Sequence, residues 1–322
     1  MPARAPYPVS DHCDGRRFFN PHRHINRGWL EVIKWRLTSR AAVWPVRVAV
    51  DPQRPPPPPT DGRIAVTFVN HATFLLQTPV GNFLTDPVWG ERASPFAWSG
   101  PRRVHPPGVR LDDLPRIDAI LLSHDHYDHC HLPTLRALAR RFQPLVVAPL
   151  GHAGLAARAG LHRCVELDWW QRHEAGAGLT VTLTPARHWS NRLSGARNGR
   201  LWGGFFVQTP GHRVYFSGDT GYDAELFRRI GRDLGPPDLA MIPIGAYAPR
   251  WFMSPMHCDP AEAVAIHRDV GARRSIGMHW GTFQLTDEAR EAPVQELAAA
   301  RAAAGLGADT FRAIGPGESV WA

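Results

Sequence analysis

The stretch that decides the fold is Ile117-Asp118-Ala119-Ile120-Leu121-Leu122-Ser123-His124-Asp125-His126-Tyr127-Asp128-His129. Its apolar first half predicts a buried β-strand, and its polar second half predicts a loop held at the end of that strand. Imidazole nitrogens and carboxylate oxygens at this spacing are ligands that suit zinc. A histidine-rich surface loop is the alternative, because the chain has 17 histidines in 322 residues.

Three later segments have the same form, an apolar or β-branched run that ends close to one possible metal ligand. The runs are 179–184 before His188, 214–217 before Asp219 and 275–278 before His279. One histidine after a strand is more often structural, but together these segments complete the set that two zinc ions with a bridging carboxylate need. The predicted metal ligands are His124, His126, Asp128, His129, His188, Asp219 and His279.

This set resembles the motifs of the metallo-β-lactamase superfamily, which are His-x-His-x-Asp-His followed by a histidine, an aspartate and a last histidine. The resemblance implies two zinc ions per chain, the first bound by His124, His126 and His188, the second by Asp128, His129 and His279, with Asp219 bridging them. Asp86 matches the superfamily's early structural aspartate, which supports the site without ligating. His126 stands where di-iron flavoproteins of this fold usually carry glutamate, so the resemblance favours zinc hydrolysis over redox chemistry.

The order of strand and helix patterns predicts a layered α/β architecture. The first half has strand patterns at 64–69, 73–77, 82–86 and 117–123 and a helical pattern at 132–142. The second half has strand patterns near 179–184, 202–208, 213–217, 238–243 and 274–278 and helical patterns near 222–233, 259–271 and 286–304. The family resemblance makes this a four-layer αββα sandwich, in which two mixed β-sheets lie face to face and the metals sit at one sheet edge.

Within the superfamily, the chain most resembles N-acyl-phosphatidylethanolamine-hydrolysing phospholipase D and its bacterial relatives. The segments that carry this likeness are 70–73, 84–89, 92–95, 100–103, 123–129, 186–189, 217–222 and 279–283. The likeness covers about residues 62 to 285, with a weaker echo at 18–21. Two positions depart from the expected pattern: Asn70 replaces a glycine before His71, and Met256 replaces a polar residue before His257.

The resemblance implies a zinc-dependent hydrolase in which a metal-bound hydroxide attacks a phosphodiester of N-acyl-phosphatidylethanolamine or a related lipid. Asp128 and His257 are the predicted catalytic residues. Asp128 would orient the hydroxide and accept its proton, and His257 would stabilise or protonate part of the substrate. The alternative for His257 is a structural hydrogen bond within its loop, and His71 either supports the site or packs as a histidine at the core edge.

Three other functions compete with this one. Zinc-activated hydroxide attacks phosphoryl and carbonyl centres alike, so a hydrolase of lactones, thioesters or other carboxylic esters is the nearest rival. A nucleic-acid phosphodiesterase is disfavoured because no separate nucleic-acid module is recognisable. A non-catalytic binding protein is disfavoured because it would not need all seven donors.

The first 60 residues are predicted to be an N-terminal extension rich in arginine and aromatic residues, which ends in the proline run 55–59. Consecutive prolines favour an extended, semi-rigid spacer, so the catalytic domain is placed at 61–322. Residues 29–37 can form a basic amphipathic helix. This helix either caps the catalytic domain or lies on an anionic membrane, which makes residues 11–50 the candidate for peripheral membrane contact.

The formal net charge of +8 comes almost wholly from arginine, since Lys34 is the only lysine. Such a bias can follow genomic base composition, so charge alone does not predict a nucleic-acid partner. The expected partner is a small-molecule or phospholipid substrate, without nucleic acid, and the sequence leaves an oligomer open. The chain shows no run of 18 apolar residues, no secretory signal pattern and no close cysteine framework. These features favour a cytoplasmic location, with peripheral contact at the inner face of the membrane as an alternative.

Overall fold

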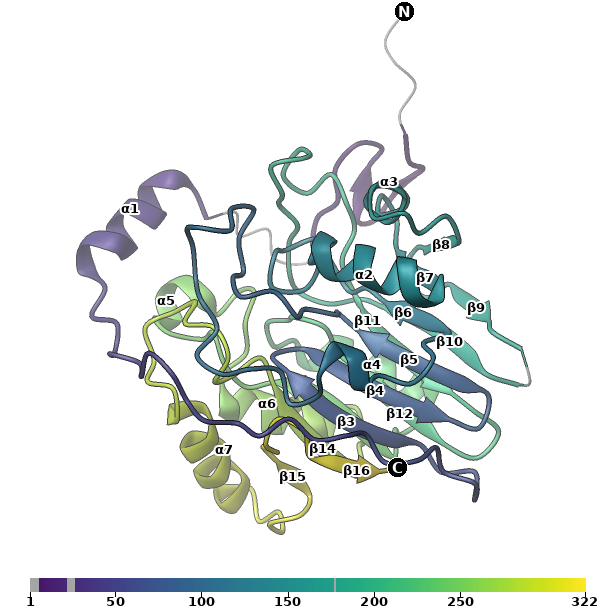
Figure 1. Cartoon of the computed structure of the whole chain (residues 1–322). Helices are drawn as coiled ribbons and strands as arrows, with labels where there is room; N and C mark the ends of the chain where they lie inside the picture. Colours follow the sequence, from purple (N-terminus) through teal and green to yellow (C-terminus); the bar gives the residue numbers. More distant parts are fainter. Residues whose placement is uncertain (1–5, 22–26, 177) are drawn as a thin grey trace, which may run out of the picture.

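Two mixed β-sheets lie face to face in the computed structural model, which describes residues 6–21, 27–176 and 178–322, and helices cover their outer faces (Figure 1). The first sheet has the strand order β16(Ser319–Trp321), β3(Ala65–Asn70), β4(Thr73–Thr78), β5(Gly81–Thr85), β6(Ala119–Leu121), β7(Leu145–Pro149) and β8(Cys164–Leu167). The second has the order β15(Phe311–Arg312), β14(Arg274–Met278), β13(Leu239–Pro243), β12(Arg213–Phe216), β11(Gly204–Gln208), β10(Thr180–Thr184) and β9(Arg172–Glu174). Neighbours pair in parallel from β5 to β8 and from β12 to β15, and antiparallel elsewhere.

Three layers of apolar side chains hold the sandwich together. Alternation along β13 shows how one strand serves two of them: Leu239 and Met241 enter the core between the sheets, whereas Ala240 and Ile242 face the outer helices. The outer layer of the second sheet packs under α4(Ala224–Leu234), α6(Pro260–Asp269) and α7(Ala292–Ala303). The outer layer of the first packs under α2(Leu132–Phe142) and α3(Ala153–Arg158). The predicted αββα sandwich is confirmed.

Local sequence determines where several of these helices begin. Asp259 caps α6 by accepting the backbone N–H of Glu262, and Pro260 occupies the first turn, as the sequence predicts. The predicted helix at 286–304 is shorter than expected, because α7 begins at Ala292 with Pro293 in its first turn. Short strands and helices absent from the prediction include β7, β8, β9, β15, β16, α3 and α5(Arg250–Met253).

The N-terminal residues lie against the sandwich. A short hairpin of β1(Val9–Ser10) and β2(Cys13–Asp14) is followed by Phe18, which is buried in the core between the sheets. The predicted amphipathic helix is present as α1(Trp29–Thr38), beside α5 in Figure 1. Residues 39–63 contain neither helix nor strand, and some of their backbone N–H groups donate to later parts of the chain, for example from Val48 to the carbonyl of Val104.

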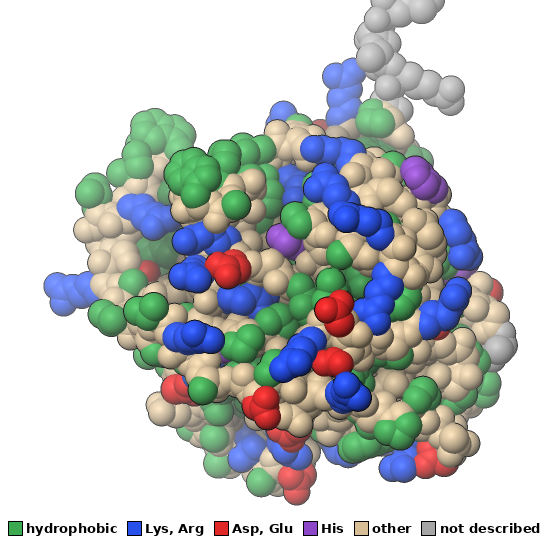
Figure 2. All heavy atoms as spheres, in the orientation of Figure 1, with side chains coloured by type: hydrophobic (Ala, Val, Ile, Leu, Met, Phe, Trp, Pro, Cys, Tyr) green, Lys and Arg blue, Asp and Glu red, His purple; other side chains and the backbone are tan. Residues whose placement is uncertain are grey.

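Helix α1 exposes much of its apolar surface. Leu37 is 80% exposed and Trp29 is 71% exposed, and Figure 2 shows hydrophobic side chains gathered over this helix. Among the described residues, no helix combines the length and apolar character that a bilayer span requires.

Candidate metal centre

Strand ends bring all seven predicted ligands to one edge of the sandwich. His124 to His129 follow β6, His188 follows β10, Asp219 follows β12 and His279 follows β14. Strands β10, β12 and β14 run in the same direction, so their carboxyl ends meet at the same edge. The loops carry the donors, and the rigid sheets hold those loops in place.

Several residues at this edge have left-handed backbone conformations. The φ angles are +48° at His71, +34° at Asp86 and +63° at His279, a region that costs free energy for residues other than glycine. Gly218, before Asp219, has a φ of +60°, and an added Cβ would lie 2.6 Å from the carbonyl oxygen of Gly203. This concentration of unfavourable conformations at one place is typical of a functional site.

Three histidines converge to form the first group of donors. His126 Nδ1 lies 2.9 Å from His124 Nε2 and 3.2 Å from His188 Nε2. His126 therefore presents its Nδ1 atom, and the other two histidines present Nε2. All three donor atoms lie within 4.8 Å of one another, which is close enough to hold one metal ion.

The second group lies next to the first and shares Asp219 with it. Asp128 Oδ2 is 3.3 Å from His279 Nε2 and 3.4 Å from His129 Nε2. Asp219 Oδ2 is 3.0 Å from His279 Nε2 and 3.2 Å from His129 Nε2, and it lies 3.9 Å from His124 Nε2 and 3.8 Å from His188 Nε2. The structure thus brings the seven residues together in the two groups that the sequence predicts, with Asp219 between them.

Hydrogen bonds on the far side of three imidazole rings orient their Nε2 atoms. His188 Nδ1 donates to the carbonyl of Met256 at 3.0 Å, and His129 Nδ1 donates to the carboxylate of Asp86 at 2.6 Å. Ser123 Oγ donates to the same carboxylate, so it accepts from His124 Nδ1 at 2.9 Å. In the neutral form, each of these rings therefore directs an unprotonated Nε2 toward the other donors.

The electrostatics of the cluster fit a pair of cations. His129 Nε2, His279 Nε2 and Asp219 Oδ1 are buried without a hydrogen-bond partner within the described ranges. Burial lowers the pKa of His124 and His188 well below the usual value. Although burial opposes it, the Asp219 and Asp128 carboxylates raise the pKa of His129 well above its usual value. Buried donors that face one another unpaired are what a bound divalent metal would satisfy.

Asp86 braces both groups of donors from behind. Its carboxylate is fully buried, accepts from the Ser123 backbone N–H at 2.7 Å and contacts His129 at 2.6 Å. Through Ser123 it also orients His124. This placement agrees with the supporting role that the sequence assigns to it.

Replacing Asp86 with alanine is expected to weaken zinc binding by ~10–100-fold, the usual effect of removing a residue that orients a ligand. The physical reason is that His129 loses the acceptor of its Nδ1–H group and Ser123 loses its fixed orientation. Titration of the apoprotein with zinc measures the change. Asp118→Ala, which removes a partly exposed carboxylate directly before β6 begins, is the control, and equal affinities in the two variants would contradict this role.

His71 and His257 lie beside the seven donors. His71 Nε2 is 3.0 Å from Asp128 Oδ2, and burial lowers the pKa of His71 to about 3. His257 Nδ1 is 4.0 Å from Asp219 Oδ2 and has no hydrogen-bond partner in the described residues. Burial lowers the pKa of His257 to about 3 as well, although the Asp219 carboxylate opposes that shift. Both histidines therefore lie next to the metal centre, where His71 can support Asp128 and His257 can contact a substrate.

A buried ion pair that the sequence analysis missed supports the histidine-rich loop. Asp125 accepts from Arg200 Nη1 at 2.9 Å, and its side chain also accepts the backbone N–H of Asn191. Arg192 donates to the carbonyls of Asp125 and Cys130, which fixes both ends of the loop. Because Arg200 and Arg192 lie far from the motif in the sequence, no local pattern indicated this brace.

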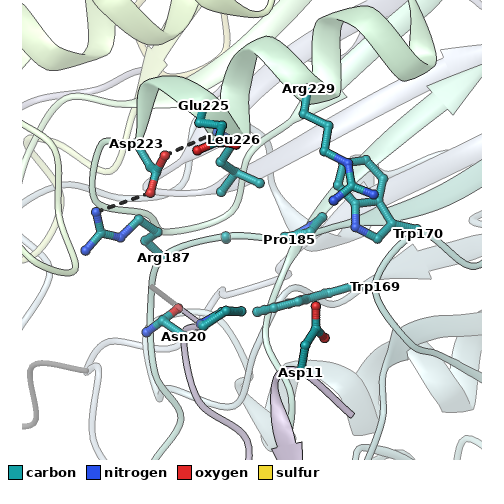
Figure 3. A pocket seen from close by; sticks show the side chains of 12 residues that line it. Asp11, Asn20, Trp169, Trp170, Pro185, Arg187, Asp223, Glu225, Leu226 and Arg229 are labelled. Carbon is teal, nitrogen blue, oxygen red and sulfur yellow. Dashed lines mark hydrogen bonds and ion pairs between the residues drawn. The ribbon is translucent and has the colours of Figure 1, made fainter. Parts of the chain in front are cut away.

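The N-terminal extension also contacts the backbone of one candidate metal ligand. Asn20 Nδ2 donates to the carbonyl oxygen of His188 at 2.9 Å. Figure 3 shows Asn20 and Asp11 of the extension on one side of a pocket, with Trp169 beside them and the Arg187–Asp223 ion pair opposite. The extension therefore helps to position a predicted metal ligand.

A groove of about 580 Å³ leads from α1 to the clustered donors. Asp128, Asp219, His257 and His279 form its inner end. Its walls are mainly apolar, and they include Val32 and Trp35 of α1 together with Trp189, Phe252, Met253, Met256 and Leu285. Trp35 stacks on Phe252 with 5.1 Å between ring centroids, so α1 forms one wall of the groove.

Residues 81–280 match the family model of the beta-lactamase superfamily domain. The chain belongs to the metallo-β-lactamase superfamily. This member is 40% identical over 288 residues to an uncharacterized protein of Mycobacterium tuberculosis (strain ATCC 25618 / H37Rv), an alignment that spans 86% of this chain and 74% of the relative. It is 41% identical over 237 residues to N-acyl-phosphatidylethanolamine-hydrolyzing phospholipase D 1 of Caenorhabditis elegans, over 70% of this chain and 66% of that protein.

A solved structure shows the same fold at lower identity. Igni18, a metallo hydrolase from the archaeon Ignicoccus hospitalis KIN4/I, superposes with a TM-score of 0.60 at 22% identity. The match covers 80% of this chain and 98% of that structure. It supports the superfamily architecture and carries no information about the substrate.

Proposed function

We propose that this metal-dependent hydrolase of the metallo-β-lactamase superfamily is a zinc phosphodiesterase that cleaves N-acyl-phosphatidylethanolamine or a related phospholipid. The observation that carries the proposal is the apolar groove that ends on Asp128, Asp219, His257 and His279. A lipid with long acyl chains would bury them against these walls while its phosphodiester lies among the donors. The similarity to the phospholipase D of Caenorhabditis elegans supports the same substrate class.

Zinc is the proposed metal because five histidines and two aspartates form the donor set. His124, His126 and His188 would hold one ion, Asp128, His129 and His279 the second, and Asp219 would contact both. Two bound zinc ions would supply water with a pKa lowered to ~7 and positive charge for the phosphoryl oxygens.

Asp128 is the residue we assign to proton transfer. Its Oδ2 atom contacts His71, His129 and His279, yet the side chain still borders the groove. The groups around it hold the pKa of Asp128 well below its usual value, despite its burial. A carboxylate kept ionised at this position can orient a water molecule, and its place at the groove is our reason for assigning it that molecule's proton.

His257 is the residue we assign to contact with the substrate. Its ring lies 5.0 Å from that of His188 and 5.4 Å from that of His279, between the donors and the groove wall. Its unpartnered Nδ1 is available for a hydrogen bond, and its place in the groove puts it beside a bound phosphodiester.

The extension completes the proposed enzyme. We assign residues 61–322 to the catalytic domain and residues 1–60 to an extension that closes one side of the groove through α1. Away from the groove, α1 exposes Leu30 and Leu37, which supports peripheral contact with a membrane. The cysteines form no disulfide, which favours the cytoplasmic side of that membrane.

The choice of phosphodiester over carboxylic ester is tested with zinc-loaded protein and two substrate types of equal acyl length. Release of phosphatidic acid from N-acyl-phosphatidylethanolamine is expected to exceed hydrolysis of an acyl-homoserine lactone and of an acyl thioester. A protein that hydrolyses the lactone or thioester and leaves the phospholipid intact would show that the rival assignment is correct.

Acyl length is expected to control the rate. For monomeric phosphodiesters that carry acyl chains of increasing length, kcat/KM should rise by up to about fourfold per added methylene, because each buried methylene contributes ~0.8 kcal/mol. The rise should end when the groove is filled. Initial rates below the critical micelle concentration give the series, and a rate independent of length would contradict an acyl-binding role for the groove.

A further inference from the structure

A second groove, lined by arginine, lies beside the metal centre. It has a volume of about 650 Å³ between the loop at 91–97, helices α2 and α3, and the loop at 192–194. Its four cationic side chains are Arg92, Arg136, Arg158 and Arg192. Glu91 is the single carboxylate among its described lining residues, and it pairs with Arg102 outside the groove at 3.1 Å.

These arginines are not neutralised by the protein. Over the ranges that the structure describes, the side chains of Arg136 and Arg158 form neither an ion pair nor a hydrogen bond. Arg92 and Arg192 donate to backbone carbonyls only, and the Arg192 guanidinium also lies 4.1 Å from the centroid of the Tyr127 ring. Unpaired cations around a concave surface concentrate positive potential in it, which favours binding of an anion.

The arginine groove borders the groove of the metal centre and has an apolar rim. Tyr127, between His126 and Asp128 in the sequence, lines both grooves. On the solvent side, Trp98 is 79% exposed and Leu193 is 76% exposed. Figure 2 shows blue cationic and green hydrophobic side chains side by side on this face. Basic and apolar side chains that are exposed together are typical of surfaces that bind anionic bilayers.

We propose that the arginine groove binds the phosphate-bearing headgroup of an anionic phospholipid in the bilayer, next to the lipid that enters the metal centre. Phe96, Trp98 and Leu193 enter the interface beside that headgroup. A bilayer accounts for both features of the surface, because a dissolved phosphate would need the arginines and would leave the exposed apolar rim without a partner. This inference rests on the proposed function in one respect only, which is that the neighbouring molecule in the metal centre is a lipid.

Vesicle binding tests the arginine groove without any turnover. The full chain is floated with vesicles of phosphatidylcholine alone or of phosphatidylcholine mixed with phosphatidylglycerol. Wild type is expected to prefer the anionic vesicles, and the variant Arg136→Glu/Arg158→Glu should lose about tenfold or more of that affinity. The matched control is Arg140→Glu/Arg163→Glu, which changes the net charge equally from outside the groove and should retain most of the binding. Equal losses in the two variants, or no loss in the first, would overturn the proposal.

Two further experiments distinguish a lipid headgroup in a bilayer from a dissolved phosphate as the source of the anion. Phe96→Ser/Trp98→Ser is expected to weaken binding to anionic vesicles, and unchanged binding would exclude insertion of the rim. Excess soluble glycerol phosphate should not displace the protein from vesicles, whereas full displacement would show a site for dissolved phosphates. Because flotation does not measure catalysis, loss of charge-selective binding contradicts this inference, and absence of phosphodiester turnover contradicts the proposed function.

Discussion

Replacing Asp128 with asparagine is expected to reduce kcat by ~10²–10⁴-fold, the usual contribution of a positioned acid or base. Asparagine has nearly the same shape, but it lacks the negative charge and cannot accept a proton from water. Its amide would also place a donor where the carboxylate now faces the imidazoles of His71, His129 and His279. The measurements are kcat with a phospholipid substrate and zinc per chain by elemental analysis.

The two measurements separate the two roles assigned to Asp128. Lost turnover with zinc retained indicates a proton acceptor, and loss of zinc as well indicates a ligand. Asp112→Asn serves as the control, because this aspartate is fully exposed and lies in a surface 3₁₀ turn over Leu111–Asp113. If Asp128→Asn kept both its zinc and its turnover, Asp128 would have neither role.

The sandwich was predictable because its central strands are strongly patterned. The run before His124 and the run before Asp219 are apolar, and both are buried strands that deliver the chain to the metal-centre edge. Strands at the sheet margins were missed, since β9, β15 and β16 have only two or three residues each. For strands this short, pairing with a neighbour decides the structure, and pairing leaves little trace in local sequence. Strand β7 is different, because its residues 145–149 are apolar and their local sequence is typical of a buried strand.

The convergence of the seven candidate donors was predictable because metal chemistry restricts residue type and spacing. The sequence could not show which imidazole nitrogen faces the site, because that depends on long-range partners such as Met256 for His188. The left-handed backbone at Asp86 and His279 was equally hidden, since a positive φ is uncommon for any residue other than glycine. The Asp125–Arg200 pair joins residues 75 positions apart and needed the fold to be seen.

The structure of the N-terminal extension was only partly predictable from its composition. Its aromatic residues indicated either a cap or a membrane surface, and α1 has a side for each: Trp35 packs on Phe252, and Leu37 points to solvent. The sequence placed a boundary near residue 60, but it gave no sign that Phe18 enters the core between the sheets. A single buried aromatic residue in an arginine-rich segment has no periodic neighbours that would reveal its burial.

Replacing Phe18 with alanine is therefore expected to destabilise the whole protein by about 3–5 kcal/mol, the usual cost of removing a buried phenylalanine ring. The side chain is 1% exposed and packs against Tyr7 with 4.8 Å between ring centroids, and its backbone N–H donates to the carbonyl of Asn198. The midpoint of urea unfolding, followed by tryptophan fluorescence, measures the loss.

Phe19→Ala is the matched control, because the neighbouring ring is only partly buried and its removal should cost about 1 kcal/mol or less. If the extension did not contribute to the stability of the sandwich, it would unfold separately. Phe18→Ala would then leave the main unfolding transition unchanged. A large shift for Phe18 and a small one for Phe19 would instead mean that the catalytic sandwich requires the extension. In that case, Asn20, which lies two residues further on and donates to the carbonyl of His188, belongs to the same cooperative unit as the sandwich.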